Sequence, residues 1–241
     1  MKKKLLIIII LVIFVWVLPG YRESLDIITS FTPSITMVVD PGHGGQDSGA
    51  CAGDGTKEKD INLSIAKLFA EEASRYKVNV ILTREDDNGL YENQDADNTK
   101  WTKTGDMKSR RATMDDAQPQ LVVSIHMNSF YADESVHGAQ VFYPTNGDPE
   151  TASKNEELAK TVRETLLAEL PDAGERIILP KKDMFIFRDA SYEGILIECG
   201  FLSNEEDLSN LQKPSYRKKF AAALMKGIAK HYDLEGQECA D

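Results

Sequence analysis

Three polar residues of types that take part in catalysis stand at or just beyond the ends of short apolar runs. They are His43, His126 and Glu198, and they follow the runs 35–39, 121–125 and 195–197. The carboxyl ends of parallel strands lie along one edge of a sheet, so three such runs would bring these side chains to a single cleft. A carboxylate behind an apolar run is costly to bury unless it is paired, protonated or bound to a cation. The pattern therefore predicts a shared polar site at one edge of a sheet.

Two imidazoles and a carboxylate are also ligand types of a catalytic zinc, which keeps one coordination position open. A further protein ligand would come from the charged segment 56–60, where Glu58 and Asp60 are both candidates. The glycines around His43 let the backbone approach a ligand closely and adopt positive φ. A tight turn that happens to contain a histidine is the alternative explanation of this loop. The residues alone leave the choice between Glu58 and Asp60 open.

The composition excludes several other classes of site. The formal net charge of −11 argues against a nucleic-acid partner, because nothing would offset repulsion from phosphate. Three cysteines, Cys51, Cys199 and Cys239, lie far apart without a CxxC pair, which excludes a zinc ribbon and a dense disulfide framework. One disulfide could form, but the odd count favours free thiols. A cysteine–histidine hydrolase would need a helix-start context that neither Cys51 nor Cys199 has, and His137 and His231 are expected at the surface.

The N-terminal segment has the pattern of an export signal. Three lysines, 2–4, precede fourteen uninterrupted apolar residues, 5–18, and the dipeptide Pro19–Gly20. Such a segment directs a chain across the membrane and leaves its basic end in the cytoplasm. No small-x-small cleavage site follows, so 1–20 is expected to be a signal peptide or an uncleaved membrane anchor. The rest of the expected organisation is a linker over 21–34, a domain outside the cytoplasmic membrane over 35–234, and a polar tail over 235–241.

The order of the predicted elements is that of a single α/β domain, with helices on both faces of a mostly parallel sheet in three layers. Strands are expected over 35–39, 78–83, 121–125, 141–143, 184–187 and 195–197. Helices are expected over 61–76, 107–117, 150–170, 205–211 and 214–232. The polar stretch 84–105 is a long loop, and a loop of this length inside a domain is usually functional or disordered.

Four motifs in the same order resemble the zinc-dependent N-acetylmuramoyl-L-alanine amidases of the amidase-3 family. They are VVDPGHGGQDSGA, KEKDINLSIA, Arg110 ahead of SIHMNS, and ILIECGFLSN. The match is colinear over nearly all of 35–232, and four motifs in order are far more specific than any one of them. The resemblance implies an α/β fold with a mixed sheet of about six strands. It also implies hydrolysis of the amide bond between N-acetylmuramic acid and L-alanine in peptidoglycan.

Carried over residue by residue, the resemblance assigns a role to each residue of the predicted site. It makes His43, Glu58 and His126 the ligands of one Zn²⁺ per chain. Asp60 then belongs only to the start of a helix. Glu198 matches the catalytic glutamate of the family, which acts as a base and then as an acid. No covalent intermediate is required by this scheme.

Two further residues are expected close to the ligands. Asp40 and Asn128 are placed to orient the zinc ligands through hydrogen bonds, and capping of turns is the alternative role for both. The departures from the family pattern are modest. The segment Glu193–Gly194–Ile195 stands where the family usually has a proline before the last strand, and Cys199 fills a position often taken by valine. Neither departure touches a proposed ligand.

The organisation of the chain favours one branch of the family. A short signal or anchor followed directly by the catalytic domain, without wall-targeting repeats, is similar to the amidases of spore-cortex maturation, and the segment 101–107 also resembles that branch. This branch removes stem peptides so that muramic-δ-lactam can form, and some members are thought to need a partner lipoprotein. The alternatives are a vegetative amidase for cell separation or autolysis, a catalytically silent peptidoglycan-binding regulator, and another zinc hydrolase such as a peptidase or a sugar deacetylase.

Overall fold

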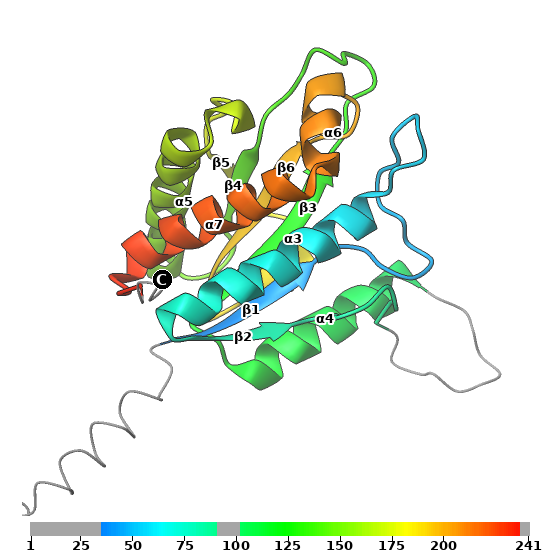
Figure 1. Cartoon of the computed structure of the whole chain (residues 1–241). Coiled ribbons are helices and arrows are strands. Elements are labelled where there is room, and N and C mark those ends of the chain that lie inside the picture. The colour runs from blue at the N-terminus through cyan, green and yellow to red at the C-terminus, as the bar shows by residue number, and fades with distance from the viewer. Residues whose placement is uncertain (1–34, 91–101, 237–241) are drawn as a thin grey trace, which may run out of the picture. The chain divides into compact units, whose positions relative to one another are not determined.

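A six-stranded mixed sheet forms the centre of the domain, in a computed structural model that describes residues 35–90 and 102–236. The strands are β1 (Ile35–Pro41), β2 (Val78–Leu82), β3 (Leu121–Asn128), β4 (Gln140–Pro144), β5 (Leu179–Lys181) and β6 (Glu193–Phe201). Their order across the sheet is β2-β1-β3-β6-β4-β5. Neighbouring strands are parallel except at β4 and β6, which are antiparallel. The carboxyl ends of β1, β3 and β6 therefore lie along one edge (Figure 1).

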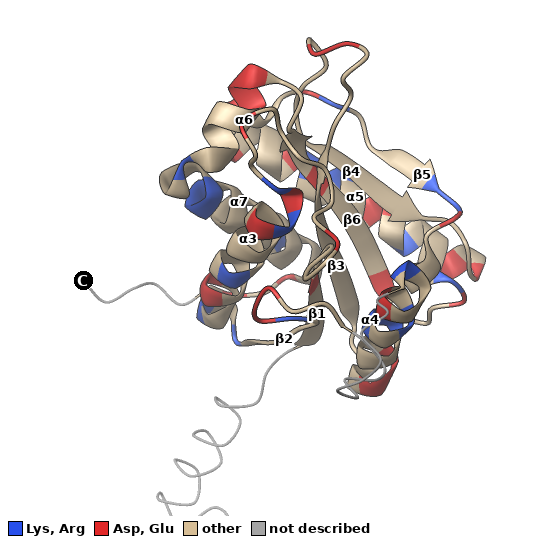
Figure 2. Cartoon of the chain, turned by 90° about the vertical axis from the view of Figure 1, so that its right-hand side faces the viewer, with Lys and Arg blue, Asp and Glu red and all other residues tan. Residues whose placement is uncertain are grey.

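Helices cover both faces of this sheet. They are α3 (Glu58–Ala73), α4 (Lys103–Ala117), α5 (Pro149–Glu169), α6 (Glu205–Gln212) and α7 (Pro214–Tyr232), with short 3₁₀ turns η1 (Ser74–Tyr76), η2 (Pro171–Ala173) and η3 (Phe185–Phe187). The first face packs against α3, α5 and α7, and the second against α4 and η3 (Figure 2). This arrangement confirms the predicted three-layer α/β domain.

The strands divide their side chains between two apolar cores because successive residues of a strand point to opposite faces. In β3, Leu121, Val123 and Ile125 join the core under α3 and α7, whereas Val122 joins the smaller core under α4. Ser124 and His126 continue the Val122 series toward the carboxyl end of the strand. Ser124 and His126 therefore lie on the face of the sheet that packs against α4 and η3.

One predicted strand is wrong, and one strand was missed. The segment 184–187 forms the 3₁₀ turn η3, whose residues Ile186 and Phe187 are buried against the second face of the sheet. A short apolar run that packs on a sheet has the same apolar pattern as a buried strand, so periodicity cannot separate them. The missed strand, β5, has three residues and contains Pro180, which is compatible with its place at the edge of the sheet.

The first residue of a helix is set by the side chain that caps it more than by the spacing of apolar residues. The helix expected from 107 begins at Lys103, because the Oγ1 atom of Thr102 accepts a hydrogen bond from the Gly105 N–H. Asp148 caps α5 in the same way at Thr151. Pro214 occupies the first turn of α7, where its missing N–H costs nothing.

The predicted thiols and terminal segments have different outcomes. Cys51 is an exposed free thiol and Cys199 is a buried one, in agreement with the prediction for these two, whereas Cys239 lies outside the described residues. The predicted signal or anchor over 1–20 and the linker over 21–34 also lie outside them. Within 35–90 and 102–236, no helix has the length and apolar character that a membrane span requires.

Candidate metal centre

The loop after β1 carries His43 in a conformation that is unusual for a residue with a side chain. The N–H of Gly42 donates to the carbonyl of Ile125 at 2.9 Å, which ties the start of the loop to β3. His43 then adopts φ 62°, in the left-handed region. A residue with a Cβ atom is strained there and persists only where its surroundings hold it. The chain thus turns sharply out of the strand and directs the imidazole of His43 over the edge of the sheet.

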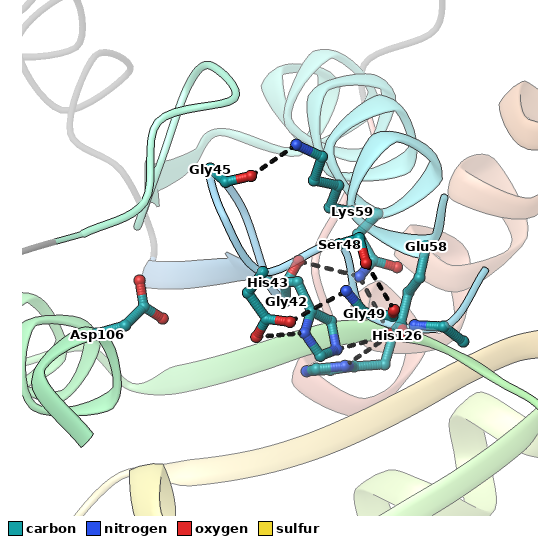
Figure 3. Close-up of polar contacts among 12 residues, drawn as sticks. Gly42, His43, Gly45, Ser48, Gly49, Glu58, Lys59, Asp106 and His126 are labelled. Carbon is teal, nitrogen blue, oxygen red and sulfur yellow. Dashed lines mark hydrogen bonds and ion pairs between the residues drawn. The ribbon is translucent and has the colours of Figure 1, made fainter. Parts of the chain in front are cut away.

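Three side chains from separate elements meet at this edge: His43 from the β1 loop, Glu58 from the first turn of α3, and His126 from β3 (Figure 3). One ligand atom from each lies within 4.8 Å of the others. The Oε1 atom of Glu58 is 3.2 Å from Nε2 of His43 and 3.0 Å from Nδ1 of His126. Two neutral imidazoles and a carboxylate are the protein ligands of several catalytic zinc sites.

The electrostatics of the cluster suit a cation. Burial alone would raise the pKa of Glu58, but hydrogen bonds and charge from His126 and His43 outweigh burial and hold that pKa well below its usual range. Glu58 is only 3% exposed. With its lowered pKa it is a carboxylate that is both buried and ionised. Such a group is stable only when cations or donors surround it.

Backbone and side-chain contacts fix the orientation of the ligands. The N–H groups of Ala50 and Met127 donate to the two oxygens of Glu58 at 2.8 and 3.0 Å. The Nδ1 atom of His43 lies 2.8 Å from Oδ2 of Asp47, whose other oxygen accepts a hydrogen bond from a backbone N–H. A carboxylate at the second nitrogen of a metal-binding histidine holds the ring in one tautomer and orientation. Asp47 was not among the predicted site residues, although its position four residues after His43 in a tight loop is a usable signal.

The tip of the same loop is held from outside. The buried Lys59 donates from Nζ to the carbonyl of Gly45 at 2.8 Å and to Oδ2 of Asp87 at 2.7 Å. The N–H of Gly45 donates to the carbonyl of Asp87 at 2.7 Å. The His43 loop is thereby pinned between the start of α3 and the segment after β2.

Two glycines leave the space that the ligand side chains occupy. A Cβ atom on Gly42 would lie 2.2 Å from Cε1 of His126, and one on Gly49 would lie 2.4 Å from Oε2 of Glu58. Gly49 also has φ +63°, where a side chain is strained. The donor types and their spacing fit a bound Zn²⁺, and the absence of a side chain at Gly42 and Gly49 gives the ligand side chains the space they need.

Gly49→Ala is therefore expected to weaken Zn²⁺ binding at least about tenfold, because the added methyl group displaces Glu58 and His43. Gly53→Ala is the matched control, since no atom lies within 4 Å of a Cβ atom built there. Zinc affinity measured by competition with a chelating dye tests both variants. Equal affinities for the two variants would contradict the role given to Gly49.

Two of the other acids considered in the sequence, Asp60 and Asp40, make no contact with the cluster side chains in the hydrogen bonds of the described residues. Asp60 is exposed on the first turn of α3, whereas Glu58 points into the cluster. Asp40 accepts hydrogen bonds from Thr83, Ser124 and Arg110 rather than from a ligand side chain.

Asn128 and the other histidines have local structural contacts. Asn128 accepts from the Ser129 N–H, which is the turn-capping alternative. His231 was expected at the surface, but it is half-buried and lies 3.3 Å from Glu193, at the end of β6 opposite Glu198. That prediction is corrected because the imidazole of His231 packs against the Tyr232 ring and contacts the Glu193 carboxylate. His137 is exposed before a glycine turn, as expected.

Glu198 lies beside the cluster on the neighbouring strand. It pairs in register with His126 of β3 on one side and with Gln140 of β4 on the other. Its Oε2 atom is buried and has no hydrogen-bond partner in the part of the chain that the structure describes. Burial raises the pKa of Glu198 above its ordinary value. A buried carboxyl group with a raised pKa is suited to act as an acid–base group.

A cavity of about 440 Å³ opens next to the cluster on the α4 face of the sheet. His43 and His126 line one part of it. Its apolar wall consists of Met107, Met184, Phe185, Ile186 and Leu196, and the basic residues in its lining include Lys103 and Lys181. An apolar cleft with a few polar groups is the usual form of a small-molecule or peptide site. The cluster is therefore accessible from a cleft large enough for part of a substrate.

An α/β sheet with a histidine–glutamate cluster and a buried acid at its carboxyl edge has the residue types of a hydrolase class in which a carboxyl group lies beside a metal site. Comparison with known proteins supports this class. The chain belongs to the N-acetylmuramoyl-L-alanine amidase family, whose sequence pattern matches residues 37–230. The family is one of cell-wall hydrolases that act on peptidoglycan, and the amidase assignment from the four motifs is confirmed.

Individual relatives agree with the family. The chain is 30% identical over 203 residues to the germination-specific N-acetylmuramoyl-L-alanine amidase of Bacillus subtilis, covering 83% of this chain and 81% of the relative. It is 29% identical to the amidase LytC of the same organism, covering 82% of this chain and 35% of LytC. Among solved structures, the CwlD amidase of Clostridioides difficile in complex with the GerS lipoprotein has 35% sequence identity and a TM-score of 0.76. That match covers 83% of this chain and 99% of CwlD.

Proposed function

We propose that this protein is a zinc-dependent amidase that removes stem peptides from N-acetylmuramic acid during maturation of the spore cortex. The observation that carries the proposal is the meeting of His43, Glu58 and His126 next to Glu198 in a chain of the amidase family. Zinc bound by the first three residues would supply a Lewis acid that polarises the amide carbonyl and makes water a better nucleophile.

Glu198 has the setting of an acid–base group in this reaction. Its raised pKa and its unpaired Oε2 atom allow it to take a proton from the attacking water and to give a proton to the leaving nitrogen of L-alanine. Asp47 holds the His43 ring, and the backbone donors at Ala50 and Met127 hold Glu58. The protein thus contributes orientation and proton transfer.

The cleft suits the peptide side of the substrate. Its apolar wall can pack against alanine methyl groups, and the lysines Lys103 and Lys181 in its lining can attract the free carboxylates of a stem peptide. The same lining also contains the acids Asp40, Asp47, Asp106 and Asp183, so the cleft as a whole has no excess of positive charge. The two lysines would therefore act as individual binding groups for a carboxylate.

The cortex role rests on the relatives. One is named germination-specific, and the CwlD structure was solved with a lipoprotein partner. For this chain we propose the same stage of wall metabolism, with a lipoprotein as a regulatory partner. We also propose export through 1–20, as a signal peptide or an anchor, with a linker over 21–34, the catalytic domain over 35–234 and a tail over 235–241.

Digestion of purified peptidoglycan tests the activity. We expect release of stem peptides with N-terminal alanine, loss of this release after treatment with a chelator, and recovery on addition of Zn²⁺. Undiminished activity in protein shown by metal analysis to be free of zinc would overturn zinc dependence. Free glucosamine amines in place of free alanine would indicate a deacetylase, and binding without release would indicate a silent regulator.

A vegetative amidase for cell separation or autolysis is the second candidate, because membership of the amidase family does not by itself fix the stage of wall metabolism. Parallel digests of vegetative wall and spore cortex separate the two functions. We expect a cortex enzyme to be required for muramic-δ-lactam in spores, so cortex from cells lacking the protein should contain none. Normal lactam content together with impaired separation of vegetative cells would instead support the second candidate.

A further inference from the structure

Two buried arginines lie beneath the loop that carries His43. Arg84 follows β2 and is 4% exposed, and Arg110 lies on α4 and is 2% exposed. A guanidinium group is rarely buried so completely unless several acceptors satisfy its donors. The identity of those acceptors shows what the two arginines hold.

Arg110 connects α4 to the loop backbone. Its Nη2 atom donates to the carbonyl oxygen of His43, and its Nη1 atom donates to the carbonyl oxygen of Pro41 at 2.9 Å. The same Nη1 atom is 2.6 Å from Oδ1 of Asp40, and Nε is 2.7 Å from Oδ2 of Asp106. The guanidinium is therefore anchored by two carboxylates, and it also donates to two carbonyl groups of the His43 loop.

Arg84 holds the neighbouring carbonyls. Its Nε atom donates to Pro41 at 2.9 Å, and its Nη2 atom donates to Gly42 at 3.0 Å and to Lys59 at 2.8 Å. Between them the two arginines engage the carbonyl groups of three consecutive residues, 41–43. Only Arg110 reaches the carbonyl of His43 itself.

The contact to His43 falls where the backbone needs support. With φ 62°, His43 is in a region that a residue with a Cβ atom leaves unless other contacts hold it. A planar guanidinium that binds the carbonyls of Pro41 and His43 fixes the orientation of the backbone at both ends of the turn. The orientation of the His43 backbone sets where its imidazole points.

We propose that Arg110 is a positioning residue for the metal centre, which holds the His43 peptide in its left-handed conformation and so presents the imidazole to the metal. Asp40 and Asp106 give Arg110 its orientation and neutralise its charge, which would otherwise oppose a cation bound close by. This proposal also gives Asp40 an indirect part in orienting a ligand. The inference rests on the proposed metal site.

Lysine in place of Arg110 provides the sharpest test. Arg110→Lys keeps a positive charge for Asp40 and Asp106 but lacks the planar fork that binds two carbonyls at once. We expect Zn²⁺ affinity, measured by chelator competition, to fall about 10–100-fold, the usual effect of losing a group that orients a metal ligand. The visible absorption spectrum of the Co²⁺-loaded protein should also change, because the ligand geometry changes.

Arg111→Ala is the matched control. Arg111 is the next residue on α4, but it contacts Asp115 and carbonyls near η3 rather than the His43 loop. We expect this variant to keep wild-type Zn²⁺ affinity and the wild-type Co²⁺ spectrum. Unfolding of the metal-free proteins, followed by circular dichroism, shows whether each variant keeps its fold.

The outcomes separate this inference from the proposed function. Absence of Zn²⁺ binding by the wild-type protein would overturn the proposed metal site and this inference with it. Tight binding by the wild type, together with unchanged affinity and spectrum in folded Arg110→Lys, would overturn the inference alone. If Arg110→Lys does not fold, Asp106→Asn decides instead: several-fold weaker Zn²⁺ binding supports the inference, and unchanged binding overturns it.

Discussion

Replacing Glu198 by glutamine is expected to lower kcat by about 10²- to 10⁴-fold, the usual contribution of a general acid–base group. Protein folding and zinc content should remain those of the wild type, because the Oε2 atom of Glu198 makes no hydrogen bond within the described residues that the amide could lose. Release of N-terminal alanine from peptidoglycan measures activity, and metal analysis measures zinc.

Glu193→Gln is the control for this experiment. Glu193 starts the same strand, but it is bound to His231 and Tyr232 at the opposite edge of the sheet. Its replacement should leave kcat within a few-fold of the wild-type value. Full activity in Glu198→Gln, with folding and zinc content intact, would rule out Glu198 as the proton-transfer group.

His126→Ala is expected to abolish activity by a different route, the loss of the metal. A catalytic zinc has only three protein ligands, so we expect the loss of one of them to weaken binding by about two orders of magnitude in Kd, or about 3 kcal/mol. The fold should survive because the ring lies at the cavity rather than in the apolar core. Dialysed protein should then contain little zinc.

The matched control is His137→Ala, which removes a histidine outside the cluster. His137 is exposed, and its backbone carbonyl rather than its ring accepts a hydrogen bond from Arg176. This variant should retain zinc and activity. Zinc retained by His126→Ala at the wild-type stoichiometry after dialysis would contradict the ligand assignment.

The convergence of His43, His126 and Glu198 was predictable because each follows an apolar run that forms part of a buried strand. β1, β3 and β6 are parallel neighbours, and His126 and Glu198 are paired in register. The side chains therefore had to meet once the strands were adjacent. The choice of Glu58 over Asp60 came from the family resemblance, because both acids lie in one helical turn and only the packing of α3 shows which is buried.

The supporting contacts were not predictable from local pattern. Asp47 acts through a turn whose backbone angles the sequence does not specify, and Arg110 reaches the carbonyl of His43 from 67 residues away. An arginine in an amphipathic helix is ordinarily solvent-exposed, so nothing in its own neighbourhood signals burial. Such long-range contacts depend on how α4 packs against the loop after β1.

The antiparallel pairing of β4 with β6 has a consequence for how this enzyme can diversify. β3 ends and β4 begins at the same edge of the sheet, so the connection 129–139 leaves and returns beside His126 and Glu198. A loop with both ends at one place can lengthen at a small entropic cost without moving a strand. Phe130 and Tyr131 lie in this connection, and about half of each side chain is exposed to solvent. Directed evolution of substrate range would therefore begin with insertions in this connection, where sequence can vary while the scaffold stays constant.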